Sequence, residues 1–134
     1  MTPLSTEIYW LTVTTVFTSM LWAPHILQRI LEMKPYAAFR DPRHDAATQA
    51  PWAQRSIRAH TNAVENLIIF GVLVLVLELS GAANGLTATA AKLYFISRVV
   101  HFAVYTFGVP WMRTPVYLFG FGCQMAIAWT VLGG

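Results

Sequence analysis

The sequence predicts an all-α fold: an integral membrane bundle of four helices, forming a single domain over residues 1–134. The first observation is composition, since 56% of the residues are hydrophobic and 11% are charged, against roughly 25% charged residues in soluble domains. The second is a set of apolar stretches near the ~20 residues that a spanning helix needs, namely Ile8–Ile30, Ile57–Leu79, Leu86–Phe107 and Pro115–Leu132. We therefore expect transmembrane helices over about residues 8–31, 54–80, 86–107 and 113–132.

The distribution of basic residues is the third observation. A net charge of +3 does not indicate a nucleic-acid partner here, because the basic residues gather between the spans instead of spreading along the chain. They lie in or beside the first loop and just after the third span, as Arg29, Lys34, Arg40, Arg43, Arg55, Arg58 and Arg113. The positive-inside rule then places the first and third loops in the cytoplasm and both termini outside.

The first span is expected to start at an aromatic pair, Tyr9 and Trp10, which suits the outer membrane interface. No Lys or Arg precedes it, which is a poor start for a signal peptide, so we expect it in the mature protein. Pro24 predicts a kink. Near the inner end, Arg29 is either a charge reaching out to water or a ligand to an anion, and the sequence leaves both open.

The segment 32–54 is the longest piece that is not apolar, and it is rich in small and turn residues. We expect a solvated connector here, in preference to a cover over the cytoplasmic mouth of the bundle.

The second span opens with a polar motif that runs directly into apolar residues. At roughly 100° per residue, Arg58, Asn62 and Glu65 share one helix face. A rise of ~1.5 Å per residue puts Glu65 about 10 Å deeper than Arg58. A carboxylate at that depth is costly unless it is paired within a bundle, so it indicates a functional or buried structural site.

The third span carries a second polar stripe of Tyr94, Arg98, His101 and Tyr105. Counting from the expected cytoplasmic ends, at Gln54 and Phe107, places Arg98 and Glu65 at similar depth, about 14 and 16 Å in. We predict that they form a structural ion pair, within the chain or across a subunit boundary. The same count places Asn62 near His101.

The fourth span begins at Arg113, with Pro115 in its first turn. Arg113 and Tyr117 share a face with Gly120, where glycine permits close helix contact. The single cysteine, Cys123, excludes an internal disulfide and is expected to be a small buried side chain.

Together the stripes bring a net positive set of side chains to the cytoplasmic half of one bundle. Arginine donates forked hydrogen bonds that suit carboxylates, so the pattern points to a small polar anion entering from the cytoplasm. Cationic groups and a tyrosine hydroxyl would also stabilise a thiolate, while a lipophilic co-substrate could arrive through the bilayer. No metal site is expected, because the four histidines are scattered. The competing interpretation is a bundle whose charges only hold subunits together.

Three motifs resemble one known family. Arg58-Ala-His-Thr-Asn62-Ala-Val-Glu65-Asn66 ahead of an apolar span, Arg98-x-x-His101-x-x-x-Tyr105, and Arg113-Thr-Pro115 are similar to the signatures of the membrane-associated proteins in eicosanoid and glutathione metabolism, the MAPEG family. The resemblance covers essentially the whole chain.

The resemblance implies a homotrimer with glutathione, as co-substrate, bound between subunits. It assigns glutathione contacts to Arg29, Arg58, Asn62, Glu65, His101 and Tyr105, and catalysis to Arg113 with support from Tyr105 and Tyr117. Family members conjugate glutathione to lipophilic electrophiles, reduce lipid peroxides or isomerise prostaglandin peroxides, and one presents lipid to a partner enzyme without catalysis.

Departures of this sequence from the family's motifs narrow the choice among the family's activities. Thr61 stands where the family's prostaglandin E synthase has an arginine, and Tyr117 with Leu118 stands where it has arginine and serine, which argues against isomerase chemistry. The chain looks closer to bacterial members, implying an inner-membrane transferase or peroxidase with periplasmic termini. One rival is a non-catalytic lipid-binding scaffold of the same fold. Another is a small exporter, which would need an embedded carboxylate where the first helix has only Glu7 at its end.

Overall fold

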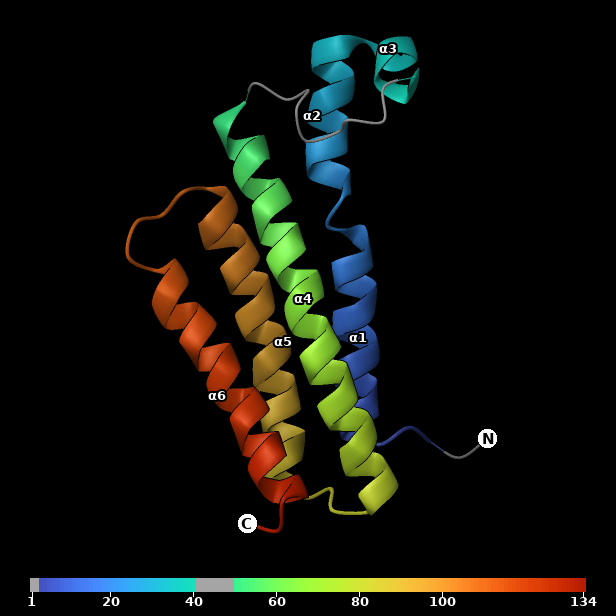
Figure 1. Cartoon of the computed structure of the whole chain (residues 1–134), viewed down its shortest axis with the longest axis vertical. Helices are drawn as coiled ribbons and strands as arrows, with labels where there is room; N and C mark the ends of the chain where they lie inside the picture. Colours follow the sequence, from blue (N-terminus) through green and yellow to red (C-terminus); the bar gives the residue numbers. More distant parts are fainter. Residues whose placement is uncertain (1–2, 41–49) are drawn as a thin grey trace.

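The computed structural model describes residues 3–40 and 50–134, and the regular structure within them is entirely helical. The helices are α1 (Thr6–Met20), α2 (Ala23–Met33), α3 (Pro35–Arg40), α4 (Pro51–Ser80), α5 (Gly85–Thr106) and α6 (Arg113–Val131). Figure 1 shows α2 continuing the direction of α1, so that α1 with α2, α4, α5 and α6 form four rods side by side. The prediction of an all-α four-helix bundle is confirmed for this part of the chain.

The first rod is broken where the sequence predicts a kink. α1 ends at Met20, a turn follows at Leu21 and Trp22, and Pro24 lies in the first turn of α2. Proline has no N–H to donate to the carbonyl of Met20, so a continuous helix would lose that hydrogen bond.

The segment predicted as a connector, 32–54, is partly helical. α2 extends to Met33, α3 occupies Pro35–Arg40, and α4 begins at Pro51, three residues before the expected Gln54. Proline is favoured in the first helical turn, which explains the earlier start of α4. Residues 41–49, on which the rest of that prediction rests, lie outside the described residues.

α4 alone, among the described helices, is long and apolar enough by itself to cross a membrane. By this test of length and hydropathy, one of the four expected spans is therefore confirmed. α1 has only 15 residues because of the break before Pro24, against the ~20 of a span. α5 has the length, but it buries Thr87, Ser97, Arg98 and His101 inside the bundle.

The centre of the bundle is packed by α4, α5 and α6, and the contact between α5 and α6 is the most extensive one. The rings of Phe70 and Tyr94 stack with their centroids 3.9 Å apart. Cys123, buried as expected, packs in the same cluster. By contrast, α4 exposes a long apolar face outside the bundle, including Ile68, Val72 and Leu79. Such a face suits lipid or another subunit.

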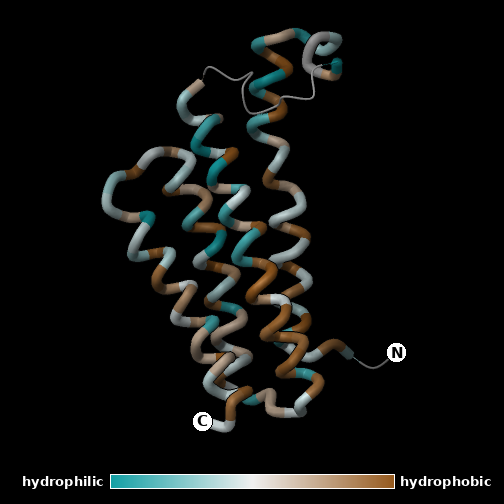
Figure 2. Tube along the Cα trace, in the orientation of Figure 1, coloured by the Kyte–Doolittle hydropathy of each residue, from teal (hydrophilic) through white to brown (hydrophobic). Residues whose placement is uncertain are grey.

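The two ends of the bundle differ in how polar α4 is. α1 begins and α6 ends at the same end (Figure 1). There Glu7, predicted at the end of the first helix, is buried, and its carboxylate accepts a hydrogen bond from the Thr87 hydroxyl. Figure 2 shows hydrophilic residues gathered along the other half of α4, toward its start at Pro51. That polar end holds the candidate site.

Candidate functional site

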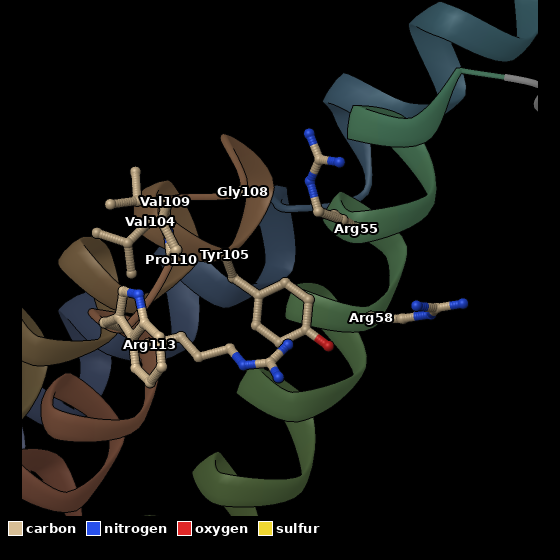
Figure 3. A pocket seen from close by; sticks show the side chains of 9 residues that line it. Arg55, Arg58, Val104, Tyr105, Gly108, Val109, Pro110 and Arg113 are labelled. Atoms are coloured by element: carbon tan, nitrogen blue, oxygen red, sulfur yellow. The ribbon is translucent and has the colours of Figure 1, made fainter.

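A cavity of about 440 Å³ opens where α4 begins, α5 ends and α6 begins (Figure 3). This volume lies in the range of small-molecule sites, roughly 300–1,000 Å³. Its lining comes from α4, the end of α5, the loop 107–112 and the start of α6: Arg55, Arg58, Val104, Tyr105, Gly108, Val109, Pro110, Trp111 and Arg113. The predicted residues Arg58, Tyr105 and Arg113 therefore meet at one site.

Arg55 fixes one wall of the cavity. Its Nε donates a hydrogen bond to the backbone carbonyl of Thr106, at 3.0 Å. Thr106 ends α5, where carbonyls lack helical partners and carry partial negative charge, so a guanidinium is well placed there. Gly108 follows with φ 69°, and a Cβ there would lie only 3.0 Å from Arg55 Nε. Glycine thus lets the loop close against this arginine.

Arg113 and Tyr105 face the interior of the cavity together. The Arg113 Cζ lies 5.3 Å from the centroid of the Tyr105 ring, within cation–π range. In Figure 3 the Arg113 guanidinium lies beside the hydroxyl end of that ring, which points toward α4. The Arg58 side chain is exposed and extends outward from α4. A cation and a phenol are therefore adjacent, with a second cation at the rim.

A polar layer lies beneath the cavity. The buried His101 ring is 5.7 Å from the ring of Tyr105 and 6.1 Å from that of Tyr117, between centroids. Arg98, also buried, places its Cζ 5.6 Å from the Tyr117 ring, and its Nη1 donates to Asn62 Oδ1 at 3.4 Å. The structure thus brings together the predicted Asn62, Arg98, His101, Tyr105 and Tyr117 in one continuous set of contacts.

The predicted pair of Glu65 with Arg98 does not form within the subunit. Arg98 instead meets Asn62, one helical turn nearer the polar end, and Glu65 is exposed on the outside of α4. Our depth count started α4 at Gln54, whereas the helix starts at Pro51. Pairing of Glu65 across a subunit boundary stays a prediction.

Arg29 is placed apart from this cavity. It is buried in α2, and it is not among the residues that line the space between α4, α5 and α6. A role for Arg29 in the same site would require a neighbouring subunit to bring it there.

Arg55 and Trp111 are lining residues that we did not predict. Arg55 could have been found, because it lies one helical turn before Arg58 in a polar helix start. Trp111 gave no comparable signal, since its place depends on the course of the loop. For metal chemistry, residues 3–40 and 50–134 contain no group of three or more His, Cys, Asp or Glu side chains able to hold an ion.

The sequence model of the MAPEG family matches residues 8–133 of the chain, which has 134 residues. No curated protein matches it. The match spans every helix that lines the cavity, so the resemblance inferred from three short motifs is confirmed over nearly the whole chain.

Proposed function

Because the chain belongs to the MAPEG family, a family of membrane proteins in glutathione and eicosanoid metabolism, we propose that it is a glutathione-dependent transferase or peroxidase. Its second substrates would be lipophilic electrophiles or lipid peroxides. The observation that carries this proposal is the cavity in which Arg113 lies beside Tyr105, with Arg55 and Arg58 in the same lining. Glutathione presents carboxylates for such guanidinium groups and a thiol that a cation can activate.

Each residue has a distinct role in this proposal. Arg58 would bind a glutathione carboxylate, Arg55 is held by Thr106 and would add positive potential, and Arg113 would stabilise the thiolate. Lowering a thiol pKa from about 9 by two units corresponds to roughly 2.7 kcal/mol. A cation and a phenol placed beside the sulfur could supply that energy, because positioned donors are among the strongest catalytic devices. Asn62, Glu65 and His101 stay proposed glutathione contacts.

In both proposed reactions, conjugation and peroxide reduction, the glutathione thiolate is the nucleophile. The thiol proton leaves to solvent, and the thiolate attacks an electrophilic carbon, forming a sulfur–carbon bond while the leaving group or opened ring takes the electron pair. With a hydroperoxide, the thiolate instead attacks oxygen and breaks the oxygen–oxygen bond. The alkoxide then takes a proton, and a second glutathione reduces the sulfenic product to disulfide and water.

We also propose that all four rods cross a bacterial inner membrane and that three subunits assemble with glutathione between them. The exposed apolar face of α4 and the exposed Glu65 and Arg58 on its outside support contacts beyond one subunit. The termini would lie in the periplasm and the cavity toward the cytoplasm. The mass of the protein in detergent tests the assembly, and a monomer that binds glutathione would contradict it.

Calorimetry with glutathione on the detergent-purified protein tests the function. We expect binding, and we expect Arg58→Ala to weaken it about tenfold or more, the loss typical of a charge-assisted hydrogen bond. The matched control is Lys92→Ala, which removes an exposed cation of α5 outside the cavity and should change the affinity less than twofold. Absence of binding at millimolar glutathione would contradict the proposal.

The second candidate is a non-catalytic lipid-binding scaffold. It is favoured by an apolar groove of about 250 Å³ between α5 and α6, lined by Ile96, Ser97, Val100, Pro115, Val116 and Phe119. A scaffold would bind lipid and show no affinity for glutathione, so the same calorimetry separates the two candidates.

A further inference from the structure

The loop between α5 and α6 exposes four large apolar side chains beside the three guanidinium groups of the cavity. These are Phe107, Val109, Trp111 and Met112. Val109, Pro110 and Trp111 also line the cavity, together with Val104 of α5. The cavity therefore has a cationic side, formed by α4 and the start of α6, and an apolar side, formed by this loop.

Trp111 is the least expected residue of the apolar side. Its backbone has φ 69°, in the left-handed region that a side chain with a Cβ disfavours. Gly108, three residues earlier, has the same φ without that cost. Packing does not compensate, because the Trp111 side chain is 91% exposed. Neither local conformation nor burial accounts for a tryptophan here, and strained residues of this kind gather at ligand sites.

We propose that Trp111 forms a subsite for the apolar body of the second substrate, the lipophilic group to which glutathione sulfur becomes attached. Only Met112 separates Trp111 from Arg113 in the sequence, and both line the same cavity. A sulfur held by Arg113 and an apolar group held against the indole would therefore be neighbours. Aromatic rings offer a large apolar surface to such a group. The subsite rests on the proposed function, because it presupposes glutathione in the cavity.

Two conjugates of glutathione test the subsite without requiring turnover. S-methylglutathione carries almost no apolar group, while S-hexylglutathione places a chain where the second substrate would lie. We expect the wild-type protein to bind the hexyl conjugate about tenfold more tightly than the methyl conjugate. Trp111→Gly should remove most of that preference and leave the affinity for the methyl conjugate within twofold.

Two further variants separate the subsite from other roles of tryptophan. Trp111→Phe keeps an aromatic wall and should retain most of the preference. Trp129→Ala removes another exposed tryptophan, on α6 outside the cavity, and should retain all of it. The thermal midpoint of Trp111→Gly should not fall, since glycine relieves the left-handed backbone.

The outcomes are distinguishable. If Trp111→Gly keeps the full preference for the hexyl conjugate, or weakens both conjugates equally, the subsite is wrong and Trp111 is a membrane-interface anchor or a structural residue. An equal affinity of the wild-type protein for the two conjugates also overturns it. If the wild-type protein binds neither conjugate nor glutathione, the proposed function itself fails, and the subsite with it.

Discussion

Arg113→Ala is expected to lower kcat for glutathione conjugation about a hundredfold, the usual loss when one donor to a developing anion is removed. KM for glutathione should change less than threefold. The reason is contact: both arginines are exposed, but the Arg113 guanidinium lies against the Tyr105 ring, whereas Arg58 extends outward from α4. Arg113 is therefore placed to act on the sulfur, and the other arginines of the lining can still hold the carboxylates.

Steady-state kinetics with a model electrophile, with glutathione varied, measures this split. Arg113→Lys is the matched control, because it keeps a positive charge but loses the planar fork, and it should retain about a tenth of wild-type kcat. Equal losses in kcat and in glutathione affinity for Arg113→Ala would instead make Arg113 a binding residue.

Gly120→Val is expected to give the largest loss of stability. A Cβ at Gly120 would lie 2.6 Å from Arg98 Nη2 and 2.6 Å from Ser97 Oγ, so the branched side chain of valine has no room between α5 and α6. Overpacking of this kind costs typically 1–3 kcal/mol. The displaced group would be the buried Arg98, so its hydrogen bond to Asn62 should be lost as well.

Gly122→Val is the matched control on the same helix, because a Cβ at Gly122 meets nothing within 4 Å. Thermal unfolding in detergent should show Gly120→Val well below wild type and Gly122→Val close to it. Equal midpoints for the two variants would mean that α5 and α6 do not pack as closely as described.

The sequence was a good guide where one helix places its own residues. Arg58, Asn62 and Glu65 were predicted at the polar start of one helix. There Arg58 lines the cavity and Asn62 meets Arg98, while Glu65 is exposed on the outside of α4. Arg113 was predicted at a helix start because of Pro115, and α6 starts there. These inferences depend on local geometry, which changes little with tertiary context.

The sequence was a poorer guide to how helices meet. A three-residue error in the start of α4 moved the expected partner of Arg98 from Asn62 to Glu65, since each helical turn advances about 5.4 Å. Trp111 was missed for a related reason, because the position of a loop residue depends on both flanking helices. The positive φ of Trp111 in particular depends on tertiary structure, and no pattern in the sequence predicted it.

The central claim is that glutathione binds in this cavity as an activated thiolate. A glutathione thiolate absorbs ultraviolet light that the thiol and S-methylglutathione do not absorb, so a difference spectrum at neutral pH reports it directly. We predict a thiolate band that saturates with glutathione in the wild-type protein and disappears in Arg113→Ala, while calorimetry still detects binding. Glutathione bound with no thiolate band in the wild-type protein would contradict the account.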